Sequence, residues 1–232
     1  MAARLINPNG SEVKNKLCKI SGTFQPVKKQ YERVNGIFVP VYYDGYILYN
    51  RLTTDGAAWV DLGHVGDSTH RYELDFSFDK INSTNYYGIF GNRESQYTRE
   101  VFVLGDSSSS VFILMRNGSD NYLATPQSEH NRVWCSISST KYEINNNGNY
   151  LTGSNQINSD FTTPNNIAAF KIAGFVLIPN LSFHSIKEYG ADGTLLYEYV
   201  PAKRQSDNVL GLLEVVNGTF HANAGSGAFT VS

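Results

Sequence analysis

Two carboxylates separated by one residue, Glu73 and Asp75, have the spacing in this sequence that is best suited to chemistry. Side chains two residues apart on a β-strand lie on the same face, so the pair could act on one bond. Carboxylates cleave glycosidic bonds when one attacks the anomeric carbon and another protonates the leaving group. A third carboxylate is needed further along the strand, but Ser77 and Phe78 stand at those positions. The sequence therefore predicts no catalytic residues and no enzyme, and the pair is interpreted as the polar side of an alternating strand.

The five histidines form no close-spaced set with another His, Cys or carboxylate of the kind that holds zinc. Asp106 and Asp120 lie in polar stretches, where oxygen ligands for calcium can gather. The ordinary composition of a surface loop explains these two residues equally well, so no cofactor is expected and calcium stays open as an alternative. Cys18 and Cys135 are expected to be reduced thiols, because two cysteines in 232 residues make no disulfide framework.

Exposed aromatic side chains offer a different chemistry, because the apolar faces of sugar rings stack on them. Three stretches mix Tyr with Asn, Gln or Arg, at residues 86–93, 96–99 and 142–150. We expect a glycan-facing surface bordered by four residues from these stretches: Tyr87, Arg93, Tyr97 and Tyr142. The alternative is that these side chains form core edges or subunit contacts. Trp59 and Trp134 stand in apolar strand contexts and are predicted to be core residues.

The elements that must position these residues are predicted to be strands. The chain has 23 Asn, 22 Ser and 20 Gly, which favour turns and interrupt helices. Residues 72–78 alternate cleanly between apolar and polar, and no stretch shows a sustained helical period. Further strands are predicted at 86–90, 101–104, 111–115, 133–137, 168–178 and 195–200, with loops at 105–110, 117–121 and 145–149. Asn217-Gly218 is predicted to be the turn between the last two long strands, with Val215 and Phe220 pointing inward. This pattern favours a two-sheet antiparallel sandwich or jelly roll.

The first 45 residues differ from the remainder in charge. They hold seven Lys or Arg against three acidic residues, whereas the whole chain has a net charge of -2. Alternating apolar residues flank Asn35-Gly36, which predicts a β-hairpin between Val27 and Tyr43. Two strands alone are barely stable in water, so this arm must contact something larger. We expect it to dock on an acidic or strand-edge partner through five residues: Lys28, Lys29, Arg33, Asn35 and Gly36.

The end of the chain carries a family resemblance. The segment LLYEYVPAKRQSDNVLGLLEVVNGTFHANAGSGAFTVS (195–232) resembles the closing segment of concanavalin A-like (laminin-G-like) domains of bacteriophages and gut bacteria. The matching positions are Asp192-Gly193, Val200-Pro201, Asp207-Asn208, Gly211-Leu212, Val216-Asn217-Gly218, Phe220, Asn223-Ala224-Gly225 and Phe229. Residues 52–64, 88–93 and 172–193 are also similar to parts of that family. The resemblance implies an all-β, concanavalin A-like jelly-roll sandwich over residues 46–232, preceded by a docking arm over residues 1–45. It does not imply one function, because the fold hosts lectins, glycosidases and inert domains.

The arm adds a second resemblance. VKKQYERVNGIFVPVY (27–42) is similar to a segment of many phage tail and virion proteins that joins a particle-binding part to a distal domain. Together the two resemblances imply a virion surface protein, of the head fibre, decoration or tail adhesin type, whose jelly roll contacts a host surface glycan. Its implied partners are other virion proteins bound through the arm and further copies of itself, with a trimer preferred. A purely architectural protein with no ligand is the main alternative, and a polysaccharide depolymerase is the lesser one.

Location and the remaining partners are also expectations. The first residues lack the apolar core of a signal peptide, so synthesis in the host cytoplasm and assembly onto the virion surface are expected. No apolar run reaches the roughly 20 residues that span a bilayer, so no membrane insertion is expected. The small negative net charge gives no electrostatic reason to expect nucleic acid binding.

Overall fold

The computed structural model describes residues 17–20, 23–26, 29–34, 37–65, 67, 69–81, 85–91, 99–104, 112–117, 122–154, 166–171 and 176–232. Every regular element in these ranges is a β-strand, as the turn-rich composition predicts. Over the same ranges, no helix exists that is long and apolar enough to cross a membrane.

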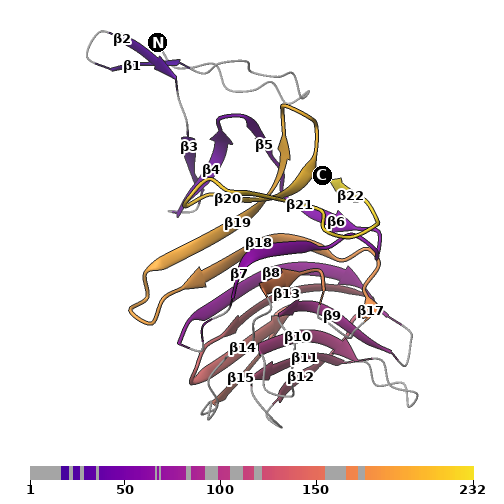
Figure 1. The fold of residues 1–232 in the computed structure, drawn as a ribbon. Coiled ribbons are helices and arrows are strands. Elements are labelled where there is room, and N and C mark those ends of the chain that lie inside the picture. Colours follow the sequence, from indigo (N-terminus) through magenta and orange to yellow (C-terminus); the bar gives the residue numbers. More distant parts are fainter. Residues whose placement is uncertain are drawn as a thin grey trace.

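The larger of two main sheets carries most of the chain (Figure 1). Its strands follow the order β15 (Asn149–Ser154), β14 (Lys141–Asn146), β13 (His130–Ile137), β8 (Arg71–Asp79), β18 (Ser182–Tyr189), β19 (Leu195–Arg204), β5 (Tyr46–Leu48), β4 (Ile37–Tyr43) and β3 (Lys29–Val34). Four short strands branch from this path: β6 (Leu52–Thr54), β20 (Leu210–Glu214), β21 (Phe220–Ala222) and β22 (Phe229–Val231). Every registered pair in this sheet is antiparallel.

The smaller sheet packs against the larger one. Its strands are β12 (Tyr122–Pro126), β11 (Phe112–Asn117), β10 (Arg99–Leu104), β9 (Tyr86–Gly91), β16 (Asn166–Ala169) and β7 (Val60–Val65), with β17 (Val176–Leu177) parallel to β9. A separate pair, β1 (Leu17–Ile20) and β2 (Thr23–Pro26), is bonded to no other described strand. The predicted all-β, two-sheet antiparallel jelly-roll sandwich is confirmed.

The core lies between the two main sheets. On β8, Tyr72, Leu74, Phe76 and Phe78 are buried, and the intervening residues are not, which confirms the predicted alternation. The ring centroids of Tyr72 and Phe90 lie 5.7 Å apart and join the two sheets. Burying one such aromatic side chain contributes about 2 kcal/mol to the free energy of unfolding. Cys135 is a free thiol within the same core, as expected for a reduced cysteine. The side chain of Cys18 is outside the described residues.

One predicted strand, 168–178, is wrong. It is divided into β16 and β17, and Phe170 at the end of β16 has φ of 68°. The buried Phe170 ring packs between Phe183 and Phe229, with centroids 4.8 and 5.0 Å away. The positive φ of Phe170 ends β16 and places the ring in the core. The run of apolar residues in the sequence does not reveal that the strand ends there.

The predicted loop at 145–149 is only a two-residue turn. Asn146 and Asn149 pair across Asn147 and Gly148, whose φ angles are 51° and 90°. Two consecutive residues with positive φ form the turn that matches the twist of a hairpin, and Asn-Gly tolerates this conformation best. The turn predicted at Asn217-Gly218 is present between β20 and β21, where Glu214 accepts hydrogen bonds from the Val216 and Asn217 amides. The predicted loops at 105–110 and, after Asn117, 118–121 lie outside the described residues.

The hairpin predicted in the arm is also present. β3 and β4 pair so that Val34 lies opposite Ile37, which leaves Asn35-Gly36 as the connection. The pairing of Tyr43 with Tyr46 joins β4 to β5, so the hairpin continues the larger sheet (Figure 1). Behind this joint lies a second hydrophobic cluster, formed by Ala202, Leu213 and Val215 with Tyr43, Tyr46, Leu48, Val200 and Phe220. The predicted inward residues Val215 and Phe220 therefore pack in this cluster.

Candidate functional site

The face of the larger sheet that points away from the core is polar. Strand alternation turns Glu73, Asp75 and Ser77 of β8 to this side, because their neighbours fill the core. The register of β13 and β14 places Trp134 between Asp75 and Asn145 in one row across the strands. Arg132 lies opposite Ser77 in the next row. We call this surface, formed by the outward side chains of β15, β14, β13, β8 and β18, the polar face.

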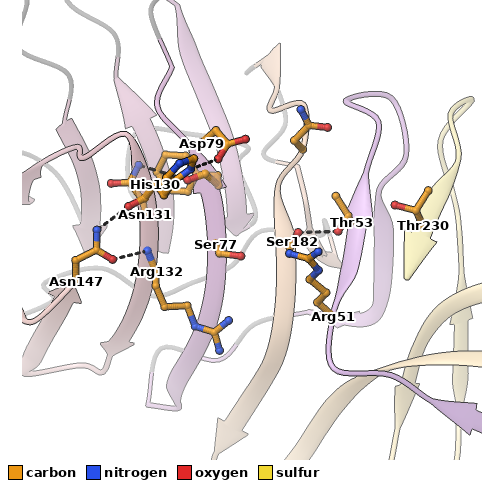
Figure 2. A pocket seen from close by; sticks show the side chains of 12 residues that line it. Arg51, Thr53, Ser77, Asp79, His130, Asn131, Arg132, Asn147, Ser182 and Thr230 are labelled. Carbon is orange, nitrogen blue, oxygen red and sulfur yellow. Dashed lines mark hydrogen bonds and ion pairs between the residues drawn. The ribbon is translucent and has the colours of Figure 1, made fainter. Parts of the chain in front are cut away.

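A pocket of about 470 Å³ opens at one end of the polar face. It is lined by Arg51, Thr53, Ser77, Phe78, Asp79, His130, Asn131, Arg132, Asn147, Asn180, Ser182 and Thr230. In Figure 2, Asp79, His130, Asn131, Arg132 and Asn147 lie on one side, Arg51, Thr53 and Thr230 lie on the other, and Ser77 and Ser182 lie between them. The two sides meet because β18 pairs with β8 along one edge and with β6 along the other.

The charged groups of the pocket are unequally paired. Arg132 Nη2 lies 2.7 Å from Asp75 Oδ2, and His130 Nδ1 lies 2.7 Å from Asp79 Oδ1. Arg51 instead donates from Nε to the hydroxyl of Ser232, at 2.6 Å. Within the described ranges, no carboxylate lies within ion-pair distance of the Arg51 guanidinium. Arg51 therefore forms no ion pair with the described side chains, unlike Arg132 and His130.

His184, which lies next to the pocket, orients the hydroxyl of Ser77. His184 Nδ1 lies 3.0 Å from the Asn50 carbonyl oxygen, so Nδ1 carries a proton and donates it. Burial, followed by the positive charge of Arg132, lowers the pKa of His184, which keeps the ring neutral near pH 7. Nε2 is then an acceptor, and Ser77 Oγ donates to it at 3.0 Å. This leaves the lone pairs of Ser77 directed at the pocket.

Asparagine side chains fix the backbone on the opposite side. Asn131 accepts from the Ser128 amide at 2.8 Å and donates to the Ser128 carbonyl at 2.9 Å. Asn147 accepts from the Arg132 amide at 3.0 Å and donates to the His130 carbonyl at 2.7 Å. These bonds hold the wall of the pocket in one arrangement, which reduces the ordering cost of binding a ligand.

The remaining carboxylates of the polar face are engaged with cations and hydroxyls. Glu73 pairs with Arg71 and accepts a hydrogen bond from Tyr189. Glu143 pairs with Lys141 and accepts from Tyr150. The hydrogen bond from Lys141, followed by that from Tyr150, lowers the pKa of Glu143. Glu143 is therefore an acceptor that stays ionised at neutral pH.

Of the four predicted glycan-facing residues, the structure describes Tyr87 and Tyr142, and neither lines this pocket. Tyr142 is buried in the core at 6% exposure, so the prediction that it borders a ligand surface is wrong. Its register opposite Ile137, an inward residue of β13, is the reason. Tyr87 belongs to the smaller sheet and packs, partly buried, against the core. Arg93 and Tyr97 lie outside the described residues, as do Lys28, Asn35 and Gly36 and the side chains of Lys29 and Arg33.

The structure brings forward residues that sequence reasoning missed. Trp134 is on the polar face and not in the core, contrary to prediction, whereas Trp59 does pack against the core. A signal for Trp134 existed, since Val133, Cys135 and Ile137 form an inward series and leave position 134 outside. No comparable signal identifies Arg51 or Ser182, because their positions depend on pairing between distant strands.

A second cluster of titratable groups is buried between the two sheets. Glu188 of β18 is 1% exposed and accepts hydrogen bonds from His64 Nε2 at 2.5 Å, His70 Nδ1 at 2.6 Å and Tyr72 at 3.1 Å. His64 belongs to β7 of the smaller sheet, so its bond to Glu188 ties the sheets together. We call Glu188, His64, His70 and Tyr72 the buried cluster.

Both ring nitrogens of His64 face acceptors. Nε2 meets the Glu188 carboxylate, and Nδ1 lies 3.1 Å from the Leu62 carbonyl oxygen. Burial acts to lower the pKa of His64, but the hydrogen bond and charge of Glu188 outweigh it, so this pKa is raised. Burial likewise acts to raise the pKa of Glu188, and His64 followed by His70 reverses this, so that pKa is lowered. The geometry is that of an imidazolium paired with a carboxylate.

Metal ligation is not a feature of either cluster. In the part of the chain that the structure describes, no three or more His, Cys, Asp or Glu residues are arranged to hold a metal ion. The two aspartates considered for calcium, Asp106 and Asp120, lie outside that part.

Comparisons with solved structures give matches at low identity. No family model matches the chain, and no curated protein matches it. A heptameric SAP-like pentraxin from Limulus polyphemus superposes with a TM-score of 0.48 at 8% identity, over 78% of this chain and 94% of that one. A Scytalido-glutamic peptidase with a peptide-based transition state analog superposes with a TM-score of 0.39 at 13% identity, over 76% of this chain and 98% of that one.

Proposed function

We propose that the chain is a surface protein of a phage virion, a head fibre, decoration or tail protein, whose jelly roll binds a host glycan at the pocket of the polar face. The observation that carries the glycan-binding part is the composition of this pocket. Its lining combines hydroxyl, amide, guanidinium and carboxylate side chains, which can bond the many hydroxyls of a sugar. Trp134 lies two residues from Arg132 on the same face of β13 and offers an aromatic surface beside the pocket.

The paired carboxylates support binding without cleavage of glycosidic bonds. Both stereochemical routes of glycoside hydrolysis need a carboxylic acid whose pKa is raised so that it can donate a proton. Glu143 has a lowered pKa, and Glu73 and Asp75 each pair with an arginine. In this proposal the carboxylates of the polar face act as acceptors for sugar hydroxyls.

The resemblance of residues 27–42 and 195–232 to phage proteins supports the virion part of the proposal. The β3–β4 hairpin is then the element that contacts other virion proteins, and the sandwich is displayed away from the particle. Several copies, in a trimer or around the particle, turn a weak contact into firm attachment, because the second contact forms at a high effective concentration.

Binding is tested by titrating the full-length chain with oligosaccharides from host cell-wall polysaccharide in a calorimeter. Trp134→Ala should weaken binding about fivefold, because an aromatic contact contributes roughly 1 kcal/mol. The control is Val216→Ala, which removes an exposed apolar side chain from the turn between β20 and β21, outside the polar face and the pocket lining. Equal losses in both variants would contradict the assigned surface. Absence of binding by the unmodified chain would favour the purely architectural alternative.

One hydrogen bond favours a second candidate function, ester hydrolysis. A serine that donates to a neutral histidine, itself oriented by a carbonyl group, has the arrangement of an activated nucleophile, and Ser77, His184 and Asn50 form it. Such a serine would give its proton to His184 and attack the acyl carbon of an ester on a sugar; the sugar hydroxyl would leave with that proton, and water would then release the acid and restore the serine. A fluorophosphonate probe should label Ser77 if this function exists. Equal labelling of Ser77→Ala, or no labelling of the unmodified chain, would exclude it.

A further inference from the structure

Of the two arginines that line the pocket, Arg51 is the one that forms no ion pair with the described residues. Its position is fixed at the Nε end, which donates to the Ser232 hydroxyl at 2.6 Å. The main-chain amides of Asn50 and Arg51 also donate to the Ser232 carbonyl, at 3.2 and 3.3 Å. The two Nη groups have no partner among the described residues. A guanidinium held by its Nε end in this way presents its outer donors without further ordering.

Arg132 approaches the same space from the opposite side. Figure 2 shows Arg132 and Arg51 on the two sides of Ser77 and Ser182. Both guanidiniums act on the partly buried ring of His184. Burial, followed by the charge of Arg132, lowers its pKa, the charge of Asp75 acts to raise it, and Arg51 adds a smaller lowering effect. Both positive charges therefore reach the ring that accepts a hydrogen bond from Ser77, a residue of the pocket lining.

The carboxylates near this space already have cation partners. Asp75 and Asp79 each have a cation partner, Arg132 and His130 respectively. The side chains of Arg132 and Asp75 are 50% and 30% exposed, and an ion pair this exposed to water is weak. Arg132 can consequently exchange Asp75 for an anionic group of a ligand at small cost.

We infer that the pocket selects an acidic glycan, whose anionic group lies between the guanidiniums of Arg51 and Arg132. This rests on the proposed glycan-binding function and names its ligand class. A uronate carboxylate and a sugar phosphate share the required chemistry, because both accept two parallel hydrogen bonds from one arginine. The lone pairs of Ser77 and the hydroxyls of Ser182 and Thr53 then accept from or donate to the neighbouring sugar hydroxyls.

The test compares three probes of matched length by calorimetry with the full-length chain. The probes are oligogalacturonate for the carboxylate, a poly(ribitol phosphate) fragment for the phosphate, and a neutral dextran oligomer. We expect one or both acidic probes to bind at least tenfold more tightly than dextran, and Arg51→Gln to remove that preference. Raising the salt concentration from 50 to 200 mM should weaken acidic binding and leave neutral binding unchanged.

Two further variants keep the result interpretable. Lys187→Gln removes a cation of the same face that does not line the pocket, and it should retain the preference for acidic probes. Arg51→Lys keeps the charge without the planar fork and should recover part of the preference. Equal binding of acidic and neutral probes, or an unchanged preference in Arg51→Gln, would overturn the inference while leaving glycan binding in place. No binding of any probe would overturn both. Circular dichroism confirms that each variant is folded.

Discussion

Two groups of charges, both built on β8 and β18, differ in their contact with water. The pocket pairs, such as Arg132 with Asp75, lie at the surface, whereas Glu188 in the buried cluster is only 1% exposed. At the surface, water screens each pair and a ligand can replace either member. Between the sheets, Glu188 has lost its hydration and depends on its partners, while the side chains of His64 and His70 keep 17% and 21% exposure. An ion pair in the pocket can therefore exchange one member for a ligand, whereas the ion pairs of the buried cluster hold the two sheets together.

The largest expected effect comes from removing the buried charge. Glu188→Gln leaves the His64 imidazolium buried without its counterion and should lower the free energy of unfolding by about 3 kcal/mol or more. Urea unfolding followed by circular dichroism measures this. The control is Glu198→Gln, which breaks the pair with Lys187 on the outer side of the same sheet and should cost below about 1 kcal/mol. Equal losses in the two variants would contradict the contrast between the two environments.

The buried cluster should also give stability a defined pH range. The raised pKa of His64 means that its contribution is complete below 6.5 and is lost as pH rises through the folded-state pKa. The lowered pKa of Glu188 means that its contribution is complete above 4.5 and is lost as pH falls through its folded-state pKa. Urea unfolding should therefore show both contributions in full between these two values. His64→Gln should flatten the decline on the alkaline side, and an unchanged decline would show that another group causes it.

The pocket should separate binding from stability. Arg132→Gln is expected to change the free energy of unfolding by less than about 1 kcal/mol, because its pair with Asp75 is exposed. The same change should weaken binding of an acidic oligosaccharide about tenfold or more, since a charge-assisted hydrogen bond to the ligand is lost. Urea unfolding and calorimetry on one preparation measure both quantities. A large loss of stability would place Arg132 with the structural charges.

The smallest effect is expected at the sheet edge. Tyr150 is 50% exposed and donates to Glu143, which already pairs with Lys141. Tyr150→Phe should leave the midpoint of thermal unfolding unchanged within error, because water replaces the lost donor. A clear decrease would show that the exposed groups of the polar face stabilise the fold after all.

How much could be predicted depended on how local each feature is. Alternation over residues 72–78 and the Asn35-Gly36 turn are local patterns, and both the strand and the hairpin are present. The break at Phe170 escaped prediction, because a buried ring forces it and apolar residues continue through it. Tyr142 and Trp134 were assigned to opposite sides from the ones they occupy, because one residue of register decides which face a side chain takes.

The candidate site was less accessible to sequence reasoning. Arg51, Arg132 and Ser182 are far apart in the chain and meet only through the pairing of β6 with β18 and of β18 with β8. Asp75 was identified as a polar strand residue, but its arginine partner could not be. A site assembled across a sheet is set by strand order, and strand order leaves no short-range pattern in the sequence.

The buried thiol of Cys135 allows the opening rate of the larger sheet to be measured. Its side chain is fully enclosed, and burial raises the pKa of the thiol, so the reactive thiolate is absent while β13 stays in place. A thiol reagent can modify Cys135 only during moments when β13 separates from β8 and β14. In a Cys18→Ser background, the modification rate therefore counts openings of the centre of the larger sheet. The modification rate of Cys135 thus measures how often the core becomes exposed to water.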